Sequence, residues 1–196
     1  MEKYYFDKPQ PRVTVGDGVV LLLVNGKQET EVMDGMPNEN GMATTEAVER
    51  KVWVYDGVRL ETGGMTSEAA LTAAAQKMVQ ERITAYDTSP SVNGFMLNGL
   101  RVWLNKDTRV GLMNSTSIAK GMGKTTTTLW FGGMEFEVNC DKAIGLLSAL
   151  EMYALECFNV TAAHKKAVAE LNTVEEVLGY DYTKGYPEQL RMEVSL

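Results

Sequence analysis

Hydrophobic and polar positions alternate over short stretches of the first 62 residues, a pattern typical of antiparallel strands. The stretches Val13–Val15 and Val19–Val24 are rich in β-branched and aliphatic residues. Asn25-Gly26 follows, and this dipeptide is typical of the two-residue turn of a β-hairpin. We therefore predict a hairpin whose returning strand covers Lys27–Met33.

A second pair of strands is predicted after residues 34–42, whose composition indicates a loop. Val48–Tyr55 is again β-rich, Asp56-Gly57 offers another two-residue turn, and Val58–Leu60 forms the return. Together these strands predict a small antiparallel β module over residues 1–62.

Helical periodicity replaces alternation in the next segment. Ala69–Tyr86 is rich in good helix formers, and its apolar residues recur every three or four positions in a narrow stripe. Thr66 or Ser67 is placed to cap this helix, and Pro90 lies just beyond its end. We predict a linker helix within residues 63–90.

The remaining chain predicts two hairpins around a helix. Phe95–Trp103 carries an Asn-Gly turn, and a helix then begins at the cap Asp107 and is closed by Gly121. The second hairpin pairs Thr125–Phe131 with Met134–Val138 through a turn at Gly132-Gly133, and strict alternation on its second arm predicts one dry and one solvated face.

A long helix is predicted from Asn139 or Asp141 to about Leu171, followed by a short helix over Thr173–Leu178. The first half of the long helix is apolar on most sides, so we expect more than one of its faces to be covered. The predicted fold class is α+β: an N-terminal antiparallel β module (1–62), a linker helix (63–90), and a C-terminal α+β domain (91–196) with two hairpins and a long helix.

Composition and charge narrow the range of possible functions. The chain of 196 residues carries a net charge of −7 without a cluster of Lys and Arg, which argues against binding to nucleic acid or to an anionic membrane. The apolar run Val19–Val24 is too short to span a bilayer, and the start lacks a signal-peptide pattern, so we expect synthesis in a reducing cytoplasm. Cys140 and Cys157 are expected to be small buried hydrophobic residues.

Three candidate chemistries can be weighed against plainer interpretations. Gly123-Lys124 imitates part of a phosphate-binding loop, but Ile118 occupies the position that requires glycine, and the predicted helix–loop–strand order is reversed. His164 is the only histidine, and Cys157 lies two turns away, about 10 Å along the helix, so a nucleophile–base pair is excluded and a hydrogen-bonded packing role is expected. Glu135 and Glu137 share one face of a strand at a spacing that a paired-carboxylate glycosidase site could use, but they are interpreted as a solvated strand face.

Five aromatic residues leave an alternative open, because such rings line carbohydrate grooves as well as cores and interfaces. They are Trp53, Tyr55, Trp103, Trp130 and Tyr186. We predict no catalytic residue, no metal ligand and no cofactor site, and therefore a protein that is not an enzyme.

Several short motifs of the C-terminal half follow a recognisable order. They are Val92-Asn93-Gly94-Phe95, Trp103, Asp107-Thr108-Arg109, Trp130, the Phe136 strand, Ala163-His164, residues 173–177 and Tyr180–Pro187. Over Ser91–Glu188 this order resembles a domain of unknown function at the C-terminal end of many bacteriophage tail-fibre assembly and tail-associated proteins. The family more often has Trp at the position of Tyr186.

The resemblance implies a phage or prophage context and no catalytic residue. It predicts a virion tail protein (tail tip, baseplate or fibre attachment) that is assembled in the host cytoplasm, contacts other tail proteins and forms a homo-oligomer, with a trimer as one arrangement. The alternatives are a tail-fibre assembly chaperone that leaves the virion and, from a different class, an enzyme or a carbohydrate-binding or receptor module. Candidate interface or fold-keeping residues are Trp103, Asp107, Arg109, Trp130, Leu147, Leu150, Tyr153, His164, Tyr180, Asp181, Tyr186 and Pro187. In this scheme Asp107 caps a helix that Arg109 braces, and Tyr186-Pro187 pins the tail against the long helix.

Overall fold

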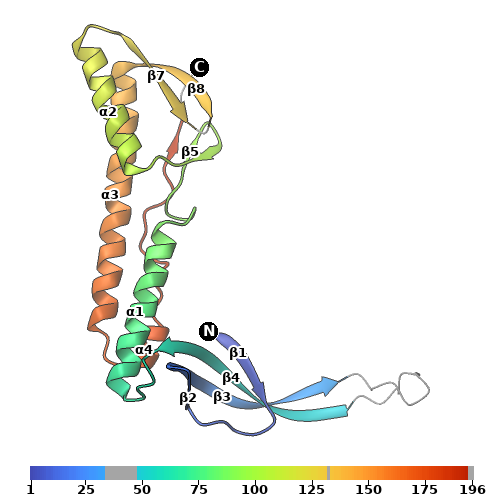
Figure 1. Cartoon of the computed structure of the whole chain (residues 1–196). Helices are drawn as coiled ribbons and strands as arrows, with labels where there is room; N and C mark the ends of the chain where they lie inside the picture. The colour runs from blue at the N-terminus through green and yellow to red at the C-terminus, as the bar shows by residue number, and fades with distance from the viewer. Residues whose placement is uncertain (34–47, 132, 194–196) are drawn as a thin grey trace. The chain divides into compact units, whose positions relative to one another are not determined.

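The computed structural model describes residues 1–33, 48–131 and 133–193 and confirms the α+β class (Figure 1). The chain divides into two compact units: a first unit of Met1–Met78 with Asn172–Glu175, and a second unit of Val79–Leu171 with Glu176–Leu196. The boundary lies inside the helix that we predicted as a linker, so this helix contributes residues to both units. The predicted loop 34–42 and Gly132 of the predicted turn lie outside the described residues.

The first unit contains a four-stranded antiparallel sheet in the order β1-β4-β3-β2. The strands are β1 (Glu2–Phe6), β2 (Val13–Gly16), β3 (Val19–Met33) and β4 (Val48–Glu61). The pattern analysis did not predict β1, which pairs along the outer edge of β4. The two long central strands supply most of the buried side chains of the sheet, among them Val20, Leu22, Val54 and Leu60.

The predicted hairpin turn at Asn25-Gly26 is wrong. The chain continues through these residues as one strand, and β3 pairs with β4 on both sides of a register shift between Val24 and Lys27. Asn25 adopts a left-handed backbone with φ of 55°, and its amide donates a hydrogen bond of 2.9 Å to Asp56. A residue tolerant of the left-handed region therefore serves here to form a β-bulge instead of a turn.

The predicted turn at Asp56-Gly57 is also wrong, because β4 passes straight through it. A Cβ placed on Gly57 would lie 2.4 Å from Cδ2 of Tyr4, and one placed on Gly26 would lie 2.4 Å from Cε1 of Tyr55. Each glycine thus leaves room for an aromatic ring from a neighbouring strand, a known device of curved sheets.

Gly57→Ala is expected to lower the free energy of unfolding of the first unit by about 1–3 kcal/mol, because the added methyl group must displace the Tyr4 ring. Gly16→Ala is the matched control, since no atom lies within 4 Å of its new Cβ. Urea denaturation followed by circular dichroism compares the two variants. Equal midpoints would contradict the packing role of Gly57.

Helix α1 (Glu68–Asp87) begins after Ser67, whose hydroxyl oxygen accepts a hydrogen bond of 3.3 Å from the backbone N–H of Ala70. The predicted apolar stripe is buried at Leu71, Ala75, Val79 and Ile83. In the first unit, Arg12 forms ion pairs with Glu68 and Glu175. The N-terminal part of α1 is therefore fixed by both an apolar and a charged contact.

The second unit contains both predicted hairpins and the long helix. Its elements are β5 (Phe95–Leu97), β6 (Leu100–Val102), α2 (Lys106–Gly121), β7 (Thr126–Phe131), β8 (Met134–Asn139), α3 (Cys140–Glu170) and β9 (Arg191–Met192), while α4 (Val174–Leu178) crosses the unit boundary. The sequence patterns did not predict β9, which adds to β5 in parallel. Helix α2 lies alongside the N-terminal part of α3 (Figure 1).

The ends of α2 differ from the prediction by two residues each. Asn105, not Asp107, caps the helix, and its side-chain oxygen accepts a 2.8 Å hydrogen bond from the Thr108 N–H. Gly121 is still helical. The left-handed residue that ends the helix is Gly123 (φ 83°), and the bonds from Gly123 and Lys124 back to the last turn form a Schellman motif. For α3, the cap is Asn139, as expected.

One face of α3 lies in the core of the second unit, where Leu147 and Leu150 are each 1% exposed among the hairpins and α2. Helix α3 contacts both α2 and the β7–β8 hairpin, but part of its apolar first half is not covered by the described chain. Met152, Leu155 and Phe158 remain 56%, 47% and 63% exposed.

Helix α3 is long and apolar enough, by length and composition, to cross a membrane, with a mean hydropathy of 1.3 in its most apolar window. A core helix of a soluble protein can have the same length and composition. Only 28% of that window is buried inside the chain. Most of this apolar stretch is therefore exposed to solvent in the single chain.

Candidate protein-binding groove

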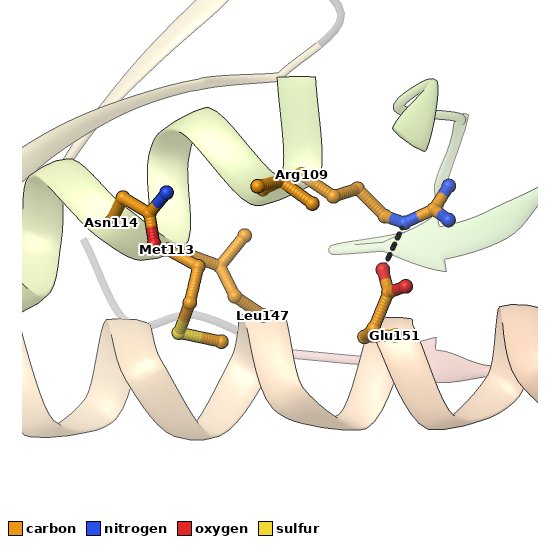
Figure 2. Close-up of a pocket in the computed structure, with 6 residues that line it drawn as sticks. Arg109, Met113, Asn114, Leu147 and Glu151 are labelled. Carbon is orange, nitrogen blue, oxygen red and sulfur yellow. Dashed lines mark hydrogen bonds and ion pairs between the residues drawn. The ribbon is translucent and has the colours of Figure 1, made fainter. Parts of the chain in front are cut away.

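Arg109 occupies the junction between α2 and α3 and is only 7% exposed. Its Nε donates a 2.6 Å hydrogen bond to Glu151 of α3, and Nη1 donates a 2.7 Å bond to the carbonyl oxygen of Leu104. Its guanidinium carbon lies 5.2 Å from the centre of the Trp103 ring, within the range of a cation–π contact. Figure 2 shows the two charged side chains reaching toward each other from facing helices, with Met113 and Leu147 beside them.

Arg109 therefore forms a charge-assisted hydrogen bond, as expected. The bond joins α2 to α3, and its acceptor is the carboxylate of Glu151. Sequence reasoning missed Glu151, although it is the only charged residue between Ala143 and Leu155. An isolated charge in an apolar stretch indicates a specific partner, because a carboxylate there must be either solvated or paired.

Two pockets flank this ion pair along the line where α2 meets α3, and we call them together the α2–α3 groove. One has a volume of about 260 Å³ and is lined by Val110, Met113 and Leu147. The other, of about 320 Å³, is lined by Trp103, Leu155 and Phe158. Arg109 and Glu151 line both, so the groove combines an apolar wall with a fixed charged centre.

Three apolar side chains that line the groove are exposed to solvent. Val110, Leu155 and Phe158 are 45%, 47% and 63% exposed. An aromatic side chain exposed beside a partly buried Arg and Trp is typical of a protein-binding hot spot. The groove can therefore bind a protein surface that offers an apolar side chain and a polar group for the central ion pair.

The C-terminal tail motif is fixed on α3 by polar contacts. The two ring nitrogens of His164 form 2.8 Å hydrogen bonds with the Tyr180 hydroxyl and the Lys184 carbonyl oxygen. Tyr186 forms a 2.9 Å bond with Thr161 of α3. These residues lie together and keep the tail in place, while Pro187 has no comparable contact among those described.

Asp181 organises the turn that follows Tyr180. It accepts hydrogen bonds from the hydroxyl and the backbone N–H of Thr183, at 2.7 and 3.1 Å, and it pairs with Lys184. The Thr183 hydroxyl, and after it Lys184, lowers the pKa of this carboxyl to about 2. Because the pKa is lowered by folding, the stabilisation of this turn is present above the ordinary Asp range and is lost as the pH falls toward 2.

The buried thiol of Cys157 is poorly suited to catalysis. Burial raises its pKa, so the thiol stays protonated at neutral pH. Burial also raises the pKa of the neighbouring Tyr153 to about 12, and its hydroxyl donates to the Val92 carbonyl oxygen at 3.0 Å. Since both nitrogens of His164 are engaged elsewhere, no Cys–His pair forms.

The other candidate catalytic and metal-binding side chains among the described residues do not form a site either. Glu137 of β8 accepts a 3.0 Å hydrogen bond from Thr126 across the hairpin, and Glu135 points to solvent beside it. Within the two described units, no group of three or more His, Cys, Asp or Glu side chains is placed to hold a metal ion. Trp130 is 56% exposed, whereas the Trp103 ring packs on Tyr153 and the Tyr186 ring on Tyr86.

Comparisons of the chain with protein-family models, with curated proteins and with solved structures find no match. The resemblance to the phage tail-associated domain therefore depends on the motif residues alone and stays a prediction. What the geometry adds is the place of these motifs: Trp103 and Arg109 line the α2–α3 groove, while His164, Tyr180 and Tyr186 hold the tail.

Proposed function

We propose that this protein is a structural component of a bacteriophage tail, at the tail tip, baseplate or fibre attachment, and that it acts by protein–protein contact. The observation that carries the contact role is the α2–α3 groove, where exposed Leu155 and Phe158 border the ion pair of Arg109 with Glu151. The tail assignment is supported by the motif resemblance. Catalysis is not part of the proposal.

The groove explains how such a contact gains specificity. Apolar burial of Phe158 and Leu155 supplies affinity in proportion to the area covered. The central ion pair is fixed by Trp103 and the Leu104 carbonyl, so a partner meets charges whose positions do not have to be ordered on binding. A fibre or baseplate subunit that presents an apolar side chain flanked by hydrogen-bonding groups fits this surface.

Phe158→Ala is expected to reduce incorporation of the protein into phage particles at least roughly tenfold, because an aromatic hot-spot truncation costs about 2 kcal/mol of binding. Met122→Ala is the control, as Met122 is 75% exposed but does not line the groove. Quantitative mass spectrometry of purified particles measures copy number for both variants and the wild type.

Wild-type protein in stoichiometric copies, with loss for the Phe158 variant alone, supports the proposal. Normal incorporation of Phe158→Ala would contradict the groove as the contact site. Complete absence of the wild-type protein from particles whose fibres still require its gene would instead support the assembly chaperone.

A further inference from the structure

A row of exposed residues runs along α3 on the side away from the core of its unit, and it borders the α2–α3 groove at Leu155. Along this face every third or fourth residue is exposed, in the seven-residue spacing of a coiled-coil seam. Its positions are Asp141, Gly145, Ser148, Met152, Leu155, Asn159, Ala162 and Lys166. We call this row the α3 stripe. It spans about 38 Å at 1.5 Å per residue.

We propose that the α3 stripe binds the α3 stripe of a second copy of this chain in an antiparallel, twofold-symmetric pair. With the twofold axis between positions 152 and 155, Met152 of each copy lies opposite Leu155 of the other. Asp141 then lies opposite Lys166, and Ser148 opposite Asn159. The stripe is therefore complementary to its own reversed copy, as a twofold interface requires.

Charge order is the observation that sets the direction. In the antiparallel pair, the flanking residue Glu156 lies beside Ala149 of the other copy, and Glu151 lies beside Phe158, so no like charges meet. A parallel pair would bring Glu151 near Glu156 of the other helix and would align Asp141 with Asp141 and Lys166 with Lys166. Like charges at such flanking positions destabilise a coiled coil and select the alternative.

The end charges are available for this pairing. Asp141 forms an ion pair with Lys120, and Lys166 lies 3.9 Å from Glu170, but these side chains are 71% and 78% exposed. Exposed ion pairs contribute little energy, so each side chain can exchange its partner at low cost. The gain comes chiefly from Met152 and Leu155, which are 56% and 47% exposed in the single chain.

The same charge order disfavours the threefold arrangement that the sequence had suggested. Helices related by a threefold axis along their length run parallel, which restores the contacts of Glu151 with Glu156 between copies. The inference does not depend on the tail assignment, because it uses only the residues of α3. The stripe and the α2–α3 groove share Leu155. A pair formed through the stripe therefore covers Leu155 at the edge of the groove. Met152 lines neither pocket, so its substitution distinguishes the pairing from binding in the groove.

Sedimentation velocity of the full chain at micromolar concentrations tests the pairing. We expect a dimer for the wild type, and Met152→Glu is expected to weaken it by roughly 100-fold or more, because a carboxylate is buried against Leu155 on both sides of the axis. Met122→Glu, at an exposed apolar position outside the stripe, is expected to leave the dimer intact. Circular dichroism establishes that both variants keep the wild-type helix content.

Disulfide trapping tests the direction. A mixture of the Ser148→Cys and Asn159→Cys chains is expected to form the mixed disulfide, whereas each variant alone is expected to stay uncrosslinked, because equivalent positions lie about 16 Å apart along the helices. Background from Cys140 and Cys157 is low, as both are buried. Efficient crosslinking of Ser148→Cys with itself would overturn the antiparallel pair. So would a monomeric wild type, including one that binds phosphatidylcholine vesicles through α3.

Discussion

Phe95→Ala is expected to lower the free energy of unfolding of the second unit by about 3–5 kcal/mol, the usual cost of deleting a buried phenyl ring. Phe95 is 1% exposed on β5, and its ring lies 6.2 Å from that of Phe131 in an edge-to-face arrangement. The surrounding side chains come from two hairpins and α3, so collapse around the missing ring would require several elements to move together. The cavity term therefore adds to the lost burial.

Urea denaturation followed by the fluorescence of the second unit's tryptophans measures this loss. Phe158→Ala is the matched control, because the same truncation at a 63% exposed position leaves no cavity and is expected to cost less than about 1 kcal/mol. The comparison also separates stability from contact, since Phe158→Ala is the variant expected to lose particle incorporation. A similar loss of stability in both variants would show that the α2–α3 groove is part of the folding core.

Arg109→Ala is expected to cost about 3 kcal/mol, near the lower end for breaking a buried ion pair. The substitution removes the hydrogen bonds to Glu151 and to the Leu104 carbonyl and uncovers one face of Trp103. The remaining Glu151 side chain is 45% exposed in the folded protein, so water can hydrate its carboxylate and limit the penalty. Glu151→Ala leaves a buried guanidinium without its anion and is expected to cost at least as much.

Thermal and urea unfolding measure how much the ion pair contributes to stability. The measurements compare the two single variants with the double variant Arg109→Met/Glu151→Leu. The apolar double variant is expected to recover most of the stability, because it removes both charges from the interface. Lys120→Ala, which breaks an exposed ion pair with Asp141, is the control and is expected to stay within about 0.5 kcal/mol of the wild type. If Arg109→Ala behaved like that control, the ion pair would not fasten α2 to α3.

Local signals predicted the helices and the second hairpin well. The caps Ser67 and Asn139 stand where the helices begin, and the alternation in Met134–Val138 matches β8, whose Phe136 and Val138 are buried. Such signals act between residues close in sequence, through a capping oxygen or the two faces of a strand, so they can be recognised without knowing the fold. Even there, the cap of α2 was predicted two residues too late, because Asn105 and not Asp107 caps the helix.

Within the candidate site, the sequence predicted residues but not their partners. Trp103 and Arg109 were singled out, yet Glu151 and Phe158 complete the groove from α3, which is far along the chain. The predicted tail contact of Tyr186 with α3 agrees with its hydrogen bond to Thr161, whereas nothing in the pattern indicated that His164 would meet Tyr180. Partners of this kind depend on how elements pack, which local periodicity does not encode.

By itself, the sequence determined the α+β class and the positions of the helices, because capping chemistry and hydrophobic periodicity are properties of neighbouring residues. Tertiary structure decided the rest. Asn25-Gly26 and Asp56-Gly57 are ideal turn residues, but β3 and β4 continue through both sites and pair with each other on either side. A β-bulge forms at Asn25-Gly26, and Gly26 and Gly57 leave room for the rings of Tyr55 and Tyr4. Strands β1 and β9 formed because partner edges were available to them, and an edge exists only after the chain has folded.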